Sequence, residues 1–168
     1  MTTYNFATQL DKGQKAEVYL DNFFTVNFDF AVTLATDEQQ RQGIDRIFVK
    51  RHGRRAQFTV EYKTDWTAAR TGNVFIETVS VDSLNKPGWA FASTADLLIY
   101  YVPGDNLIYV MFLSKLRRML PRWQEQYPSA PPIPNKGYNT LGLLVPMREF
   151  ERHSAKVINV SDYEKLPA

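Results

Sequence analysis

The chain has 168 residues, the size of one domain that can bury a substantial core without a metal or disulfide. Hydrophobic residues make up 44% and charged residues 23% of the sequence, values that exclude a disordered or fibrous chain. Cysteine is absent, which excludes disulfide frameworks, thiolate zinc sites and cysteine nucleophiles, and the 20 basic residues nearly balance the 18 acidic ones. Only local clustering of charge can therefore indicate a nucleic-acid partner.

Nothing in the sequence predicts a membrane or secretory protein. The N-terminal segment contains neither the basic nor the apolar stretch of a signal peptide. The most apolar segment, residues 97–113, is interrupted by a Pro-Gly-Asp-Asn turn and is shorter than the roughly 20 apolar residues of a membrane-spanning helix. Together with the lack of cysteine, these features predict a soluble, cytoplasmic protein.

The N-terminal third changes from helical to strand periodicity. Apolar residues fall on one face of a helix expected over residues 13–24, and residues 24–34 then alternate between apolar and polar, which predicts a strand. Two further strands are expected over residues 43–51 and 56–63, joined by a turn at residues 52–55. The expected order is a helix followed by an antiparallel meander.

The rest of the chain predicts more strands and at least one further helix. A strand is expected over residues 74–81, a short helix or ordered loop over 89–95, and two strands over 97–102 and 107–112. Ser114 begins a helix whose Leu116, Leu120 and Trp123 face the core, with a kink or early end at Pro121. A proline-rich connector follows at residues 127–134, then an apolar run at 141–145. We expect a single α+β domain over residues 1–168, with a mixed sheet flanked by helices.

Three charged residues in the expected meander suggest chemistry. Glu61 and Lys63 lie two apart on one strand and therefore share a face, and the hairpin can bring Asp45 next to them. Two crowded carboxylates repel each other unless a cation neutralises them, and oxygen ligands favour Mg²⁺ or Mn²⁺. Lys63 adds a positive charge able to orient an attacking water or to stabilise a transition state, so the set suits phosphodiester hydrolysis.

Asp45 and the Glu61-Tyr62-Lys63 sequence resemble the PD-(D/E)xK nuclease superfamily, in which an acidic residue opens one strand and Glu-x-Lys lies on the next. Residues 13–17 resemble its first-helix glutamate segment, and residues 70–77 with 86–89 resemble phage-type or Holliday-junction-resolvase-like members. The resemblance spans residues 13–112, with Ile44 in place of the proline that names the motif.

This resemblance implies a restriction-endonuclease-like αβββαβ core and a magnesium-dependent DNA endonuclease. Asp45 and Glu61 would be metal ligands, Lys63 the catalytic lysine, and Glu17 an outer or second-metal ligand. Cutting both strands of a symmetric duplex calls for two copies of the site, which is compatible with a homodimer.

Basic residues gather beside the expected site. Between residues 41 and 55 the chain carries six basic residues and only one acidic residue, Asp45. Phosphate contacts supply most non-specific affinity for DNA, so we expect this segment to hold the backbone. The residues that we assign to it are Arg46, Lys50, Arg51, Arg54 and Arg55. Trp66 and Trp89 lie in expected loops, where they either stack on bases or serve as packing lids.

Two other classes of protein stay open. The first is a catalytically silent nucleic-acid-binding module of the same fold, and the second is a structural protein in which Asp45 and Glu61 form unrelated salt bridges.

Glu17 is equally compatible with a site residue and a surface charge, and Glu77 is expected to pair with a surface lysine across strands. His52 and His153 are too few and too far apart for a histidine metal site, and phosphate-binding glycine loops are absent from the sequence.

Overall fold

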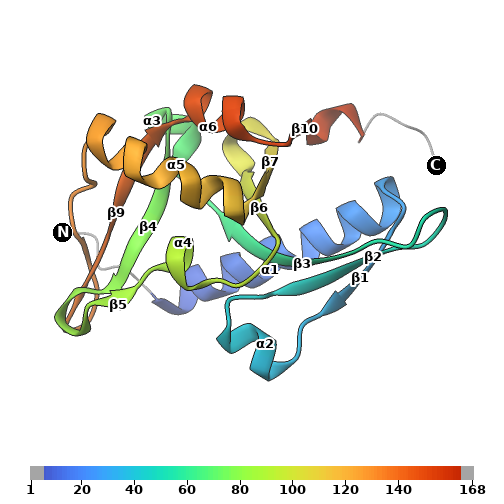
Figure 1. The fold of residues 1–168 in the computed structure, drawn as a ribbon, viewed down its shortest axis with the longest axis horizontal. Coiled ribbons are helices and arrows are strands. Elements are labelled where there is room, and N and C mark those ends of the chain that lie inside the picture. Colours follow the sequence, from blue (N-terminus) through green and yellow to red (C-terminus); the bar gives the residue numbers. More distant parts are fainter. Residues whose placement is uncertain (1–5, 164–168) are drawn as a thin grey trace.

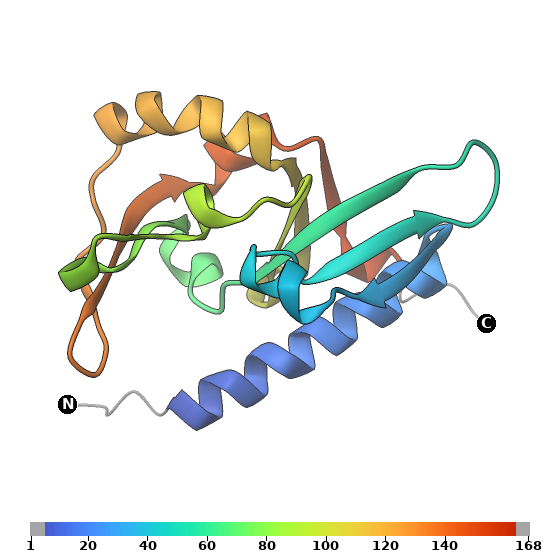
Figure 2. The ribbon, with the colours of Figure 1, turned by 60° about the horizontal axis from the view of Figure 1, so that its bottom comes forward.

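The structure is a computed structural model that describes residues 6–163, with side chains described from residue 12 onward. Two β-sheets and two long helices, α1 (Phe6–Asn27) and α5 (Leu113–Gln126), form its main layers (Figure 1). Helix α1 runs along one side of the larger sheet, and α5 lies on the other side of the molecule (Figure 2). The class is mixed α+β, as expected from the sequence.

Six strands form the larger sheet, in the order β1-β2-β3-β6-β7-β10. Neighbouring strands are antiparallel except for β3 and β6, which run parallel. The sheet is therefore mixed, and its first three strands form the meander that the sequence predicts. Their bounds are Phe30–Leu34 (β1), Arg46–Lys50 (β2), Gln57–Thr64 (β3), Leu97–Val102 (β6), Leu107–Phe112 (β7) and Lys156–Asn159 (β10).

A smaller sheet has the order β5-β4-β9-β8 and joins the middle of the chain to its C-terminal third. Strand β4 (Asn73–Val81) pairs antiparallel with β9 (Asn139–Pro146), and short strands β5 (Lys86–Pro87) and β8 (Ile133–Pro134) lie at the edges. The apolar run at residues 141–145 is thus part of a strand.

Short helices complete the described part of the chain. They are α2 (Asp37–Arg41), α3 (Ala68–Thr71), α4 (Trp89–Ala92) and α6 (Met147–His153), with single 3₁₀ turns at Asp82–Leu84, Pro103–Asp105 and Val160–Asp162. No helix between residues 6 and 163 is both long enough and apolar enough to cross a membrane.

The larger sheet separates two apolar cores. Every residue of β6 is buried, and alternate residues from Leu97 join the core beneath α1 while those from Leu98 join the core beneath the smaller sheet, α5 and α6. The same alternation continues in β3, whose Val60 and Tyr62 lie in the core beneath α1. Glu61 and Lys63 therefore project from the opposite face, towards the smaller sheet.

Helix α1 extends further than its expected end at residue 24. It continues to Asn27, and β1 begins only at Phe30, so the strand predicted from residue 24 is wrong over its first part. Phe24 and Phe28 fit a helical spacing as well as an alternating one, and their ring centroids lie 5.5 Å apart. Phe24 packs into the core beneath α1, and this packing favours the helix over the strand for residues 24–27.

Pro121 does not end α5 early, since the helix continues to Gln126. Proline in a helix interior costs about 3 kcal/mol. Leu116, Leu120 and Trp123 are all 0% exposed, and burying each such side chain contributes about 1.5–3 kcal/mol. The apolar packing of the helix therefore outweighs the missing backbone hydrogen bond.

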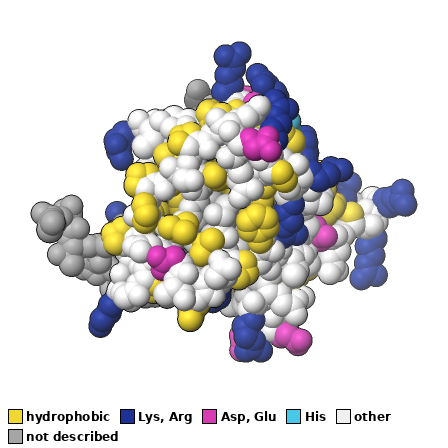
Figure 3. Space-filling model, turned by 60° about the vertical axis from the view of Figure 1, so that its left-hand side comes forward, with side chains coloured by type: hydrophobic (Ala, Val, Ile, Leu, Met, Phe, Trp, Pro, Cys, Tyr) yellow, Lys and Arg dark blue, Asp and Glu magenta, His cyan; other side chains and the backbone are white. Residues whose placement is uncertain are grey.

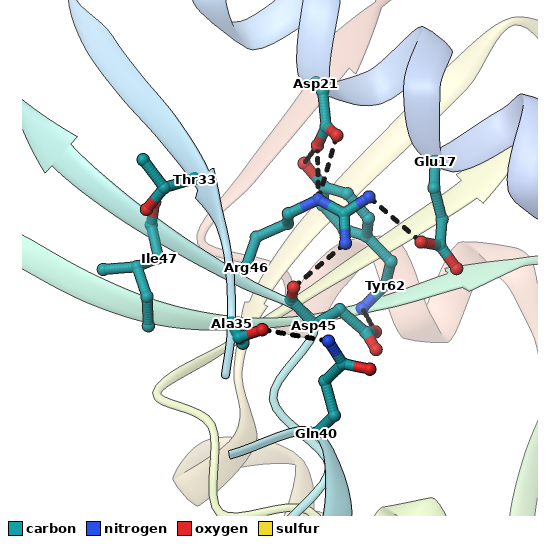
Figure 4. Close-up of polar contacts among 9 residues, drawn as sticks. All are labelled: Glu17, Asp21, Thr33, Ala35, Gln40, Asp45, Arg46, Ile47 and Tyr62. Carbon is teal, nitrogen blue, oxygen red and sulfur yellow. Dashed lines mark hydrogen bonds and ion pairs between the residues drawn. The ribbon is translucent and has the colours of Figure 1, made fainter. Parts of the chain in front are cut away.

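Arg46 fixes α1 to the sheet through charge. Its Nε donates to Asp21 at 2.8 Å, its Nη2 donates to Glu17 at 3.0 Å, and its Nη1 donates to the carbonyl of Asp45 (Figure 4). The Tyr62 hydroxyl also donates to Asp21, at 3.1 Å. Arg46 is only 6% exposed, so its charge depends on these partners.

We expect Arg46→Met to lower the free energy of unfolding by about 3 kcal/mol, because removing one partner of a buried pair leaves charges uncompensated. The value lies at the low end for such pairs, since the side chains of Asp21 and Glu17 retain 30% and 37% exposure. Urea denaturation measures the loss, with the exposed Arg55→Met as control. Equal stability of the two variants would contradict this role.

Candidate functional site

The site lies where β2 begins and β3 approaches its end. In the register of the hairpin Arg46 pairs with Val60, so Asp45, one residue earlier, lies opposite Glu61. Asp45, Glu61 and Lys63 therefore share the sheet face turned away from α1. The structure brings these three sequence-predicted residues together.

A direct contact joins the side chains of Glu61 and Lys63, and the backbone between these two residues holds Asp45. The Lys63 Nζ lies 2.5 Å from Oε1 of Glu61. Asp45 Oδ2 accepts a hydrogen bond of 2.7 Å from the amide of Tyr62, the residue between Glu61 and Lys63 (Figure 4). The backbone of β3 thus holds the Asp45 carboxylate beside the Glu61–Lys63 pair.

Glu61 is the most buried carboxylate of the set. The residue is 3% exposed, and its Oε2 atom is buried without a hydrogen-bond partner in the described part of the chain. A buried carboxylate oxygen without a partner loses the hydration it would have in water, which is unfavourable unless another group compensates. This oxygen therefore lacks the compensation that a donor or a cation would give it.

Burial raises the pKa of Glu61, and the charge of Asp45 raises it further, against the opposing effects of Lys63 and of the Ser93 hydroxyl. Burial alone would lower the pKa of Lys63, but the charges of Glu61, Asp45 and Glu77 outweigh it and raise the pKa, so the ammonium form is favoured. Glu61, Asp45 and Glu77 thus all interact electrostatically with Lys63.

The carboxylates suit a hard divalent cation bound in part by solvent and substrate. Among the described residues, no three His, Cys, Asp or Glu side chains converge closely enough to form a metal site by themselves. Mg²⁺ ordinarily binds through one or two carboxylates and completes its shell with water and substrate phosphates. The juxtaposed Asp45 and Glu61, with the orphaned Oε2 atom, fit that pattern.

Glu17 approaches from the opposite side of the sheet. It lies on α1 and pairs with Arg46, and its side chain is 37% exposed. Burial raises the pKa of Glu17, and the charge of Asp45 raises it next, so the two carboxylates influence each other. Glu17 also lines the cavity described below, so it borders the site without joining Asp45 and Glu61 on their face.

Glu77 is a further acidic residue at the site. It comes from β4 of the smaller sheet, and its Oε1 accepts from the amide of Trp89 at 3.3 Å. Burial raises the pKa of Glu77, and the charges of Lys63 and Lys86 oppose that shift. Its place beside Lys63 could not be predicted from the sequence, because it depends on how the smaller sheet packs against the larger one.

Two glycines allow loops to pack closely around these residues. A Cβ atom on Gly43, whose φ is +73°, would lie 2.7 Å from Cα of Ser93, and the Ser93 hydroxyl donates to the Gly43 carbonyl at 2.5 Å. A Cβ on Gly88 would lie 2.5 Å from the Glu77 carbonyl oxygen. Arg117 holds the same region from α5 by donating to the carbonyls of Ala90 and Ser93.

A cavity of about 600 Å³ adjoins the site. Lys63, Glu17 and Glu77 line it on the side of the charged residues. Aromatic side chains form much of the remaining wall: Trp66, Trp89, Phe75, Tyr62 and Tyr100. The Lys63 side chain therefore lies at the edge of a space whose volume is typical of small-molecule sites.

The expected phosphate-binding residues divide into two groups. Arg46 is buried and ion-paired, so it has no free guanidinium for DNA, and we withdraw it from the set of phosphate contacts. The other four are exposed: Lys50, Arg51, Arg54 and Arg55. We call these four residues the hairpin cluster.

The hairpin cluster lies farther from the site than expected. Asp45 and the cluster occupy opposite ends of β2, and at about 3.3 Å per residue Arg51 lies about 20 Å from Asp45. The β2–β3 turn projects away from the rest of the sheet (Figure 2). On the left-hand side of the molecule as drawn in Figure 1, hydrophobic side chains occupy the centre and Lys and Arg side chains gather at the edges (Figure 3).

Comparison with known proteins gives a structural match. No family model matches the sequence, and no curated protein matches it. Among solved structures, the chain is similar to a bacterial homing endonuclease, with a TM-score of 0.41 and 19% sequence identity. The match covers 62% of this chain and 66% of that one, so it spans slightly less than two thirds of the neighbour.

We expect Lys63→Met to destabilise the fold, because Glu61 would lose its charged partner inside the protein. The pKa of Glu61 would rise further, so the folded state would hold a proton that the unfolded state releases. Stability of the variant would then be greatest below the unfolded-state pKa of glutamate and would fall as pH rises through the raised folded-state pKa. Urea denaturation at pH 5 and pH 8 measures this difference.

The double variant Glu61→Met with Lys63→Met is the matched control, since it removes both charges and keeps most of the volume. It is expected to be more stable than Lys63→Met at pH 8 and to lack that variant's additional pH dependence. A single variant as stable as the wild type at both pH values would show that the pair does not compensate charge.

Proposed function

We propose that this protein is a metal-dependent endodeoxyribonuclease that hydrolyses phosphodiester bonds in DNA. The observation that carries the proposal is the buried Glu61–Lys63 pair beside Asp45, with Oε2 of Glu61 left without a partner. A carboxylate pair with an adjacent ammonium group suits metal-assisted phosphodiester hydrolysis.

Asp45 and Glu61 would hold Mg²⁺ or Mn²⁺, with Glu17 as an outer ligand. A divalent cation bound there would offset charge on the scissile phosphate and lower the pKa of a bound water. The Tyr62 amide orients Asp45 by donating to one carboxylate oxygen, so that the carboxylate need not reorganise when the substrate binds. Burial of Glu61 excludes bulk water from its side of the site.

Lys63 would act on the substrate through its ammonium group. Its charge is maintained by three neighbouring acids, and its side chain is 33% exposed, so it faces both Glu61 and the cavity. From this position it would donate a hydrogen bond to the attacking water or to a phosphate oxygen, which stabilises charge that develops in the transition state.

The hairpin cluster would hold DNA at a distance from the cut. A separation of about 20 Å corresponds to about six nucleotides along one strand at 3.4 Å per phosphate. The cluster would therefore contact the flanking backbone, which positions the duplex without specifying sequence.

We expect the purified protein to nick plasmid DNA in Mg²⁺ or Mn²⁺ and to be inactive in excess chelator. Glu61→Ala and Lys63→Ala are expected to lower the nicking rate by about 100-fold or more, the scale of removing one group that stabilises the transition state. Gel analysis of supercoiled plasmid measures the rate.

Glu125→Ala and Lys136→Ala are the controls, since both residues are exposed and lie outside the site. DNA binding by gel shift verifies that the site variants remain folded and able to bind. Salt-dependent binding without cutting of linear, branched or single-stranded DNA would contradict the enzyme and favour a silent binding module.

Replacing Arg51, Arg54 and Arg55 by Gln is expected to weaken DNA binding and to reduce its dependence on salt. On duplex DNA, the slope of log K against log salt should fall by about 0.9 for each phosphate that the variant no longer neutralises. Fluorescence anisotropy over a salt series measures both effects.

The matched control replaces Lys115, Arg118 and Arg122 of α5 by Gln, which removes the same charge from another basic surface. A larger decrease of the slope in this control than in the hairpin variant would place the DNA on α5 and contradict the proposed path.

A further inference from the structure

We infer that the cavity beside Lys63 receives an unpaired DNA base, which stacks on Trp66. This inference rests on the proposed nuclease function. The protein would thus act on DNA in which a base next to the cleaved phosphate is single-stranded or extruded from the duplex. This names a substrate class and a base-binding site in addition to the metal site.

The size and position of the cavity support this assignment. Its volume of about 600 Å³ falls within the range of about 300–1,000 Å³ typical of small-molecule sites. Lys63 belongs both to the cavity wall and to the catalytic set, so a nucleotide with its phosphate at Lys63 would place its base in the cavity. A base stacked inside a duplex cannot enter such a space, so it must be unpaired.

Trp66 provides a partly exposed aromatic surface, near which the ammonium of Lys12 lies. It is 48% exposed and belongs to neither apolar core, whereas Trp89 packs against the larger core. A large exposed aromatic side chain at a cavity is typical of a binding surface, and stacking on aromatic rings is the usual mode of contact with unpaired bases.

The cavity wall carries both signs of charge, since Glu17, Asp65 and Glu77 line it together with Lys63. Lys12 lies over the Trp66 ring with its Nζ 5.9 Å from the ring centroid, and Lys63 lies over Trp89 at the same distance. Each indole thus has a cation nearby that suits the phosphate of a stacked nucleotide. The Glu77 carboxylate can accept a hydrogen bond from the exocyclic amino group of a base. A phosphate group has no such donor, so Glu77 favours the base end of a nucleotide.

Intrinsic fluorescence tests the inference without cleavage. The chain has 3 tryptophans, and Trp123 is 0% exposed, so quenching by DNA reports on Trp66 and Trp89. Titrations in excess chelator would compare a single strand, a fully paired duplex and a duplex with one mismatched base. We expect quenching by the single strand and the mismatched duplex.

Trp66→Ala is expected to abolish most of the quenching and to weaken single-strand binding by about 5- to 150-fold, the range for one stacked base, while Trp66→Tyr retains binding. Phe112→Ala is the matched control, because Phe112 is 45% exposed and lies outside this cavity. Thermal denaturation followed by circular dichroism verifies that all variants are folded.

Quenching by the paired duplex as well would identify extrusion from the duplex as the source of the base and would still support the site. Absence of quenching by every DNA, or quenching and affinity that persist in Trp66→Ala, would overturn it. If the protein nicks plasmid without quenching, the base site is wrong and the nuclease stands. If quenching occurs without nicking, the nuclease is wrong and the cavity still binds an unpaired base.

Discussion

The arrangement of this protein depends on the cost of placing the Glu61 carboxylate inside it. A charged group that is 3% exposed requires a partner, and Lys63 provides one at 2.5 Å. Asp45 lies beside the pair and adds negative charge to it. In the proposed function, a bound cation would compensate the two carboxylates further, and the rest of the structure would determine how a substrate reaches it.

Glu61 and Lys63 are positioned by the alternation of side chains along β3 and by the burial of the neighbouring strand β6 on both faces. Strand β6 is buried on both faces, and it fixes the face on which each residue of its parallel neighbour β3 lies. Arg46 and Tyr62 project to α1, where they bind Asp21, while Glu61 and Lys63 project to the smaller sheet. One register thus creates a structural ion-pair network on one face and a candidate catalytic set on the other.

Much of this could be predicted from sequence where the information is local. The Glu61-Tyr62-Lys63 spacing fixes a shared face on any strand, and the turn at residues 52–55 brings Asp45 opposite Glu61. Burial of Arg46 could not be predicted, because it requires acids on a helix distant in the chain. The approach of Glu77 to Lys63 depends on how the two sheets pack, and the true length of α1 depends on the packing of Phe24.

The most direct test of the central claim is anomalous diffraction from a crystal soaked in Mn²⁺. The account predicts a peak within coordinating distance of both Asp45 and Glu61, with Lys63 beside it. A peak that contacts neither carboxylate, or none at this position at saturating Mn²⁺, would contradict metal-assisted chemistry at this site.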